Sequence, residues 1–193
     1  MEVFNGVMDR RQKRTVEAIV RAFCILIKQK CFEKITVQEI IDEANIGRST
    51  FYSHFETKEA LLSKICEEMF SHIFMTALKV DASGERIHRS KNETLEHILF
   101  HIKNDNQEIL GILINQSNLI FLNSFKVYFY KVIEDILLSP NTHKSTNIPR
   151  EVIKNHLHCS FIGIVQIWIE GGFIESEETI AKYYIDMTSS VLA

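Results

Sequence analysis

The chain has 193 residues, a formal net charge of −3 and 46% hydrophobic side chains, a composition typical of a globular protein that is long enough to bury a core. Only two prolines and seven glycines occur, so long helices are favoured over sheets with many turns. The sequence shows neither a signal-peptide pattern nor an apolar run of bilayer length, and its four cysteines are scattered singly, so we expect a cytoplasmic protein with reduced thiols.

The first predicted helix begins in a short basic run, residues 9–14, and ends near Lys30. Its apolar side chains recur at helical spacing from Val16 to Ile27, which predicts an amphipathic helix that packs against the segments that follow. Residues 1–60 hold ten Lys and Arg against nine Asp and Glu, whereas residues 61–193 hold twelve against sixteen. The charge therefore permits binding to a nucleic acid but does not by itself support it.

Residues 36–45 predict a short second helix with defined ends. Thr36 and Glu39 have the spacing of a capping box, in which the hydroxyl and the carboxylate each satisfy a backbone N–H at the helix start. Apolar residues then follow at positions i, i+3, i+4 and i+7, which is one face of a helix. These residues are Val37, Ile40, Ile41 and Ala44. Asn45 ends the pattern, and Asn tolerates the left-handed backbone conformation that closes many helices.

A third short helix is predicted after a turn of about three residues. Gly47 is an acceptable N-cap, and Ile46, Phe51 and Phe55 form the apolar stripe of this helix. Its outer face carries hydrogen-bond donors and no carboxylate. The residues of this face are Arg48, Ser49, Thr50, Tyr52, Ser53 and His54. A helix, a tight turn and a second helix with such a face predict a helix-turn-helix that contacts bases and phosphates in the major groove of DNA.

Residues 36–62, which read TVQEIIDEANIGRSTFYSHFETKEALL, resemble the DNA-binding signature of the TetR (tetracycline repressor) family of transcriptional regulators. They depart from it at three positions. The family usually has Ala where this chain has Ile41, usually has Gly where it has Asn45, and often has Ser where it has Gly47. The resemblance implies that three residues enter the groove, namely Arg48, Ser49 and Thr50, and that four hold phosphates, namely Thr36, Tyr52, His54 and Lys58. It also makes the basic run at residues 9–14 a candidate for DNA contacts, although a solvated helix start fits that run equally well.

The rest of the chain predicts further helices and no convincing strand. Thr57 is the expected N-cap of a long fourth helix that runs to about Lys79. Residues 80–92 and 139–147 are polar and aperiodic, which predicts loops. Three further helices are expected at residues 93–103, at residues 120–138 and from Pro149 to Glu170, with Gly171 and Gly172 at the end of the third. A last helix is expected from Ser176 onward.

The expected fold class is all-α. An N-terminal DNA-binding domain of three helices, including the helix-turn-helix, would occupy residues 1–56, and a larger C-terminal helical domain for ligand binding, regulation and dimerisation would occupy residues 57–193. The last two predicted helices are apolar on more than one face, so they are buried on several sides. The resemblance implies that they pair with their copies in a two-fold homodimer, which suits a palindromic operator. A monomer with a thick core is the alternative.

A pocket for an unidentified small-molecule effector is expected among the middle helices. The candidate residues are Phe100, His101, Phe121, Phe125, Phe129, Phe161, Gln166 and Trp168. Aromatic residues at helical spacing are more often plain core than ligand contacts, by roughly two to one. The sequence therefore leaves a pocket and a packed core as alternatives for these residues.

No cofactor, metal site or enzymatic activity is expected. His97 and His101 are four residues apart, and His156, His158 and Cys159 cluster, but a zinc site needs three or four converging ligands. Solvated or buried histidines are favoured by about five to one, with a metal sensor as the alternative. The sequence has no glycine-rich phosphate loop, no G-x-S-x-G and no H-E-x-x-H motif, which lowers the odds of an enzyme.

The function that we expect is that of a homodimeric transcriptional repressor, which leaves a palindromic operator when an effector binds its C-terminal domain. The alternatives are a transcriptional activator and a co-regulator of the same fold that acts through a protein partner instead of DNA. The donor-only face of the third helix argues against the co-regulator, because such a protein has no need of that face. The sequence identifies neither the effector nor the operator and its genes.

Overall fold

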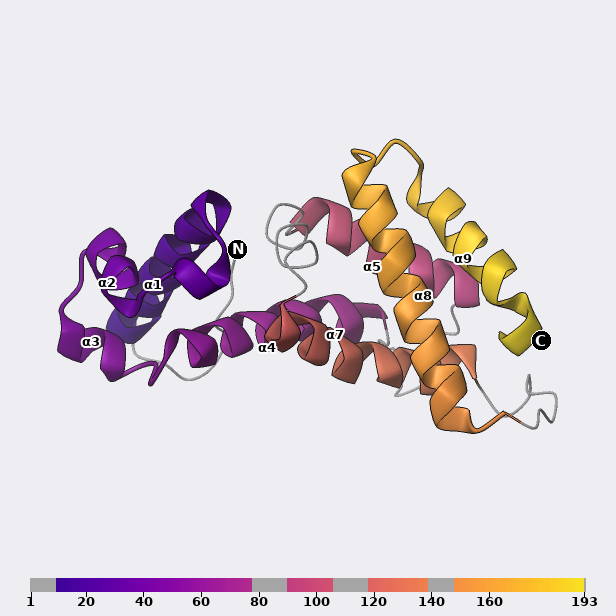
Figure 1. Ribbon diagram of the computed structural model, residues 1–193, viewed down its shortest axis with the longest axis horizontal. Coiled ribbons are helices and arrows are strands. Elements are labelled where there is room, and N and C mark those ends of the chain that lie inside the picture. The colour runs from indigo at the N-terminus through magenta and orange to yellow at the C-terminus, as the bar shows by residue number, and fades with distance from the viewer. Residues whose placement is uncertain (1–9, 78–89, 106–117, 139–147, 193) are drawn as a thin grey trace. The chain divides into compact units, whose positions relative to one another are not determined.

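The computed structural model describes residues 10–77, 90–105, 118–138 and 148–192 of the chain (Figure 1). Every regular element within these ranges is a helix, so the predicted all-α class is confirmed for them. In the same ranges no helix is both long and apolar enough to cross a membrane. The chain divides into two compact units, Met1–Met69 with Glu108–Ser124 and Phe70–Gln107 with Phe125–Ala193.

The first unit is built on α1 (Arg10–Gln29), which packs against α2 (Val37–Ala44) (Figure 1). The predicted stripe of α1 is buried, with Ile19 and Phe23 completely shielded from solvent. Because α1 presents this stripe from Val16 to Ile27, over about three turns, it supplies the apolar surface on which the shorter helices rest.

Two short helices and the start of a long one complete the N-terminal part of this unit. The one-turn 3-10 helix η1 (Phe32–Lys34) follows α1 and buries Phe32, while Ile35 closes the same core at 1% exposure. Helix α3 (Arg48–Tyr52) follows α2 and contacts it. The long helix α4 (Lys58–Ala77) then begins with the predicted cap, in which the N–H of Ala60 donates to Thr57 Oγ1 at 3.1 Å.

Within the described residues, the second unit holds the end of α4 from Phe70, most of α7 and four further helical elements. Helix α5 (Lys91–Asp105) packs against α9 (Glu177–Leu192), and α9 packs against α8 (Arg150–Glu170) (Figure 1). Helix α7 (Leu119–Val132) enters this unit at Phe125 and continues into the single π-helical turn η2 (Ile133–Leu137). An aromatic cluster forms the middle of the unit's core. Its members are Phe70, Phe74, Phe125, Phe129, Phe161 and Tyr184.

Several predicted boundaries differ from the observed ones. Residues 91 and 92, expected in a loop, are helical because Ser90 and Glu93 form a second capping box. In this box the N–H of Glu93 donates to Ser90 Oγ at 3.2 Å, and the N–H of Ser90 donates to Glu93 Oε2 at 2.7 Å. The predicted helix at 120–138 is α-helical only to Val132. Pro149 is the N-cap of α8 and not its first residue. The predicted loop at 139–147 and most of the one at 80–92 lie outside the described residues.

Candidate nucleic-acid interface

The turn between α2 and α3 is fixed by local hydrogen bonds at both ends of α2. The N–H of Glu39 donates to Thr36 Oγ1 at 3.3 Å and the N–H of Thr36 donates to Glu39 Oε2 at 2.9 Å, so the predicted capping box is confirmed. Asn45 adopts the predicted left-handed conformation with φ 51° and ψ 52°. The N–H of Ile46 then donates to Ile41 O at 3.2 Å, which closes α2 and turns the chain towards α3.

Helix α3 is anchored by one buried aromatic side chain. Gly47 is its N-cap, as expected, and the N–H groups of Thr50 and Phe51 both donate to Gly47 O, at 3.0 and 3.1 Å. The Phe51 ring is completely buried, and its centroid lies 6.0 Å from that of Phe55. Since Phe51 points into the core, the opposite side of the helix faces solvent.

That solvent-facing side of α3 carries the predicted donors. Arg48 and Ser49 are exposed, Tyr52 is 47% exposed, and Thr50 and His54 are half-buried. The Phe51 and Tyr52 rings meet edge to face at 5.5 Å between centroids, which holds the phenol in a defined place at the surface. We call these five residues, Arg48 to Thr50 with Tyr52 and His54, the α3 outer face.

Thr36, a predicted phosphate ligand, is engaged inside the protein. Its hydroxyl donates to Glu39 Oε2 at 2.9 Å, and its backbone N–H donates to the same carboxylate. Lys30 forms a short ion pair with the other oxygen of Glu39. The Lys30 ammonium, followed by the two Thr36 donors, lowers the pKa of Glu39 to about 2. Both Thr36 donors thus serve the capping box, which leaves neither directed at a phosphate.

Lys58, another predicted phosphate ligand, has a structural role that the sequence does not show. Its ammonium donates to the carbonyl oxygens of Phe32, Glu33 and Ile35 at 2.9, 3.1 and 2.7 Å. It also lies 4.7 Å from the centroid of the Phe32 ring, within cation–π range. A lysine has three N–H donors, and here each has a carbonyl acceptor. Lys58 therefore joins the start of α4 to η1, and these contacts do not agree with its predicted role on phosphate.

The aromatic candidates for a ligand pocket are mostly in contact with one another. Phe125, Phe129 and Phe161 are each at most 3% exposed, and the rings of Phe129 and Phe161 stack at 4.4 Å between centroids. His158 lies against the Phe125 and Phe129 rings, and burial, with a smaller effect of the Lys126 charge, lowers its pKa to about 4. These side chains form a packed layer of the core.

The remaining ligand candidates lie elsewhere. Gln166 bonds Glu170 at 3.0 Å on an exposed surface, and Trp168 packs on Phe173 and donates to the carbonyl of Glu175 at 2.9 Å. Phe121 is completely buried and belongs to the first unit. The other two candidates are on α5: His101 bonds Asp105, and Phe100 is 51% exposed.

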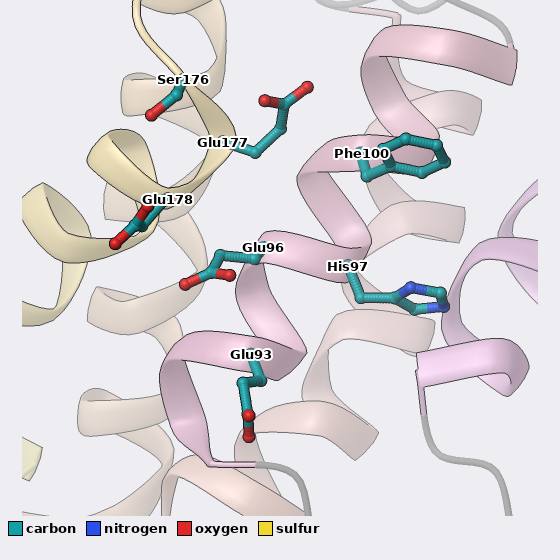
Figure 2. Close-up of a pocket in the computed structure, with 7 residues that line it drawn as sticks. All are labelled: Glu93, Glu96, His97, Phe100, Ser176, Glu177 and Glu178. Atoms are coloured by element: carbon teal, nitrogen blue, oxygen red, sulfur yellow. The ribbon is translucent and has the colours of Figure 1, made fainter.

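Phe100 lines an acidic pocket of about 490 Å³ between α5 and α9 (Figure 2). Its other lining residues are Glu93, Glu96, His97, Ser176, Glu177 and Glu178. Figure 2 shows Glu96 directed towards α9 and His97 directed away from it. Two of these carboxylates also have structural roles. Glu177 pairs with Lys103 at 3.1 Å, and both Glu177 and Glu178 lie in the first turn of α9, where the helix dipole favours anions. The sequence did not single out these carboxylates.

An apolar groove of about 630 Å³ lies between α8 and α9. Ile167 is 71%, Met187 61% and Tyr183 48% exposed along it. Gly163 also lines the groove, and a Cβ atom added there would meet nothing within 4 Å. So many exposed apolar side chains on one surface are typical of an interaction site.

Comparison with known proteins identifies relatives of both halves of the chain. A family model described as bacterial regulatory proteins, tetR family, matches residues 15–65, and one described as transcriptional regulator C-terminal region matches residues 90–190. The crystal structure of a TetR transcriptional regulator from Streptococcus agalactiae 2603V is 34% identical, with a TM-score of 0.76 over 93% of this chain and 96% of that one.

Two curated relatives are regulators of the helix-turn-helix type. YxbF of Bacillus subtilis, uncharacterised, is 22% identical over 176 residues, which are 91% of this chain and 45% of that protein. DhaS of Lactococcus lactis, an activator of the dhaKLM operon, is 37% identical over 59 residues, which are 31% of this chain and 32% of that protein. The chain thus spans less than half the length of the curated relatives it matches.

Proposed function

Because the chain belongs to the TetR family of bacterial regulatory proteins, we propose that this helix-turn-helix transcriptional regulator acts as a homodimeric repressor of a palindromic operator. The α3 outer face carries this proposal: it presents an arginine, two hydroxyls, a phenol and an imidazole to solvent on a helix held by a buried ring. Residues 1–56 would bind DNA in the cytoplasm, and residues 57–193 would dimerise and respond to an effector.

The roles on DNA follow from exposure and hydrogen bonding. Arg48 begins α3, so its guanidinium can reach the acceptor atoms of a guanine in the major groove, with Ser49 and Thr50 beside it. Tyr52 and His54 lie further along the α3 outer face and would contact the phosphate backbone. We leave Thr36 and Lys58 out of the contacts with DNA, because their donors are bonded within the protein.

Fluorescence anisotropy with DNA from upstream of this protein's own gene tests the assignment of Arg48. We expect Arg48→Ala to weaken binding to the operator by about 1–3 kcal/mol and to relax the preference at one base pair. Arg150→Ala, on α8, removes the same charge from a different helix and serves as the matched control. If Arg48→Ala bound every sequence as the wild type does, or if both variants lost affinity equally on all sequences, the proposed role of Arg48 would be refuted.

The groove between α8 and α9 supports the proposed dimer. Its exposed Ile167, Tyr183 and Met187 would become buried against the same helices of a second copy, in a two-fold interface. Gly163→Leu fits the isolated protomer, because the space around the added Cβ is open, but it would obstruct a partner helix. We expect this variant to sediment as a monomer with wild-type helicity in analytical ultracentrifugation. A Gly163→Leu dimer of unchanged affinity would contradict this interface.

Activation is the second candidate for the direction of regulation, because the relative of Lactococcus lactis is an activator. A reporter gene behind the operator separates the two: deletion of the regulator raises expression if it is a repressor and lowers it if it is an activator. The acidic pocket between α5 and α9 is the proposed effector site, and its carboxylates would favour a cation or a ligand rich in donors. A chain that binds no DNA at all would favour the co-regulator acting through a protein partner.

A further inference from the structure

We propose that His72, His101 and Asp105 form a binding site for a divalent transition-metal ion in the second unit. His72 is near the C-terminal end of α4, and His101 and Asp105 lie one turn apart at the end of α5. Each can offer one ligand atom, and the three atoms all lie within 4.8 Å of one another. Two helices that are far apart in the sequence therefore bring three ligands to one place.

One separation already suits an ion held by these three residues, which we call the His72–His101–Asp105 cluster. His72 Nε2 lies 3.6 Å and His101 Nδ1 lies 2.5 Å from Asp105 Oδ2. Two ligand atoms bound to zinc at tetrahedral angles are roughly 3.3 Å apart, so the first separation already matches. The second is a hydrogen bond, which a small rotation of the Asp105 side chain would replace by a bond from each residue to the ion.

The donor set defines the class of ion. Two imidazole nitrogens and one carboxylate oxygen suit Zn²⁺, Co²⁺ or Ni²⁺, whereas Mg²⁺ and Ca²⁺ prefer oxygen alone. His72 is 61% and Asp105 32% exposed, so an ion can enter from solvent, while His101 at 13% is held in place by its surroundings. The His97 and His101 rings pack edge to face at 4.6 Å between centroids, which helps to fix the orientation of His101.

An ion at this place would join α4 to α5. The imidazole rings of His72 and His101 lie 5.2 Å apart and nearly perpendicular, at 85°, so their nitrogens can approach one point from different directions. Because the unfolded chain does not hold these three residues together, binding would stabilise the folded protein. Sequence patterns pointed to His97 with His101, but they could not add His72 and Asp105, whose contact arises only in the folded chain.

Titration of the metal-free 193-residue chain with Co²⁺ tests this proposal. We expect one Co²⁺ per chain with visible absorption bands of cobalt bound to nitrogen and oxygen, displaced by Zn²⁺, and a higher melting temperature with either ion. His72→Ala and Asp105→Ala should each weaken binding by at least about tenfold. Asp42→Ala, which removes an exposed carboxylate from α2, is the matched control and should bind as the wild type does.

Three outcomes would overturn the proposal. One is the absence of saturable binding at one ion per chain, and another is unchanged affinity in His72→Ala while circular dichroism shows a folded protein. The third is a sulfur-to-cobalt charge-transfer band, which would place the ion on the exposed Cys31 or Cys159. The readout is direct metal binding in the absence of DNA. A chain that binds no metal would therefore leave the proposed transcriptional regulation untouched, and a chain that binds no DNA would leave the proposed metal site untouched.

Discussion

The α3 outer face and the aromatic cluster of the second unit contrast in what their side chains contact. Arg48, Ser49 and Tyr52 are exposed polar groups on a helix that a single buried ring, Phe51, holds in place. In the cluster, Phe129 and Phe161 are completely buried against other rings. A polar group without a folding role invites a functional explanation, whereas a buried ring is already explained by packing. This is why residue chemistry points to DNA but not to an effector.

The same contrast exists within the first unit. Tyr52 and Lys58 are both donors and both were expected on phosphate, yet Tyr52 is exposed and Lys58 bonds three carbonyl groups. Donor chemistry alone does not distinguish a residue that binds DNA from one that holds the DNA-binding unit together. Three mutational experiments test whether these distinctions are right.

The largest effect is expected in the aromatic cluster. Phe161→Ala removes a completely buried ring that stacks on Phe129 at 4.4 Å and meets the Tyr184 ring at 5.2 Å. We expect the free energy of unfolding in urea to fall by about 3–5 kcal/mol, because the neighbours cannot fill the cavity. Phe100→Ala, at a half-exposed ring, is the control and should cost far less. A small loss of unfolding free energy for Phe161→Ala would indicate a loosely packed cluster with room for a ligand. The contrast between this cluster and the α3 outer face would then be wrong.

A smaller effect is expected at Lys58. Lys58→Met keeps an unbranched apolar side chain but removes the ammonium from three carbonyl oxygens, so we expect the unfolding free energy to fall by about 2 kcal/mol. The dependence of DNA affinity on salt concentration should keep its slope, because no phosphate contact is lost. Unchanged stability with a slope lower by about one would instead make Lys58 a phosphate ligand.

The smallest effect concerns the pH dependence contributed by Glu39. Its pKa in the folded protein is lowered to about 2 by Lys30 and Thr36, so its contribution to stability is complete above the ordinary pKa of a glutamate and is lost as the pH falls towards 2. The wild type should be more stable than Glu39→Gln at pH 7, and the difference should shrink below about pH 4.5. A difference that is constant from pH 7 to pH 3 would show that the charge of Glu39 contributes nothing.

Local signals predicted the helix-turn-helix accurately. The capping box of Thr36 and Glu39, the left-handed Asn45 and the N-cap at Gly47 each depend on residues at most a few positions apart, and the structure has all of them. The buried Phe51 follows from the apolar stripe of one short helix. Even the missed start of α5 has a local signal, since Ser90 and Glu93 have the same capping spacing as Thr36 and Glu39.

The sequence by itself thus determined the helices, their caps and the chemistry of the α3 outer face, because these depend on neighbours along the chain. Only the tertiary structure decided that Lys58 bonds the carbonyl of Phe32, 26 residues away, and that His72 meets Asp105. It also decided that the Phe125, Phe129 and Phe161 rings pack on one another. Helical periodicity says which face of a helix is buried, but the partner of that face is set by how distant segments fold together.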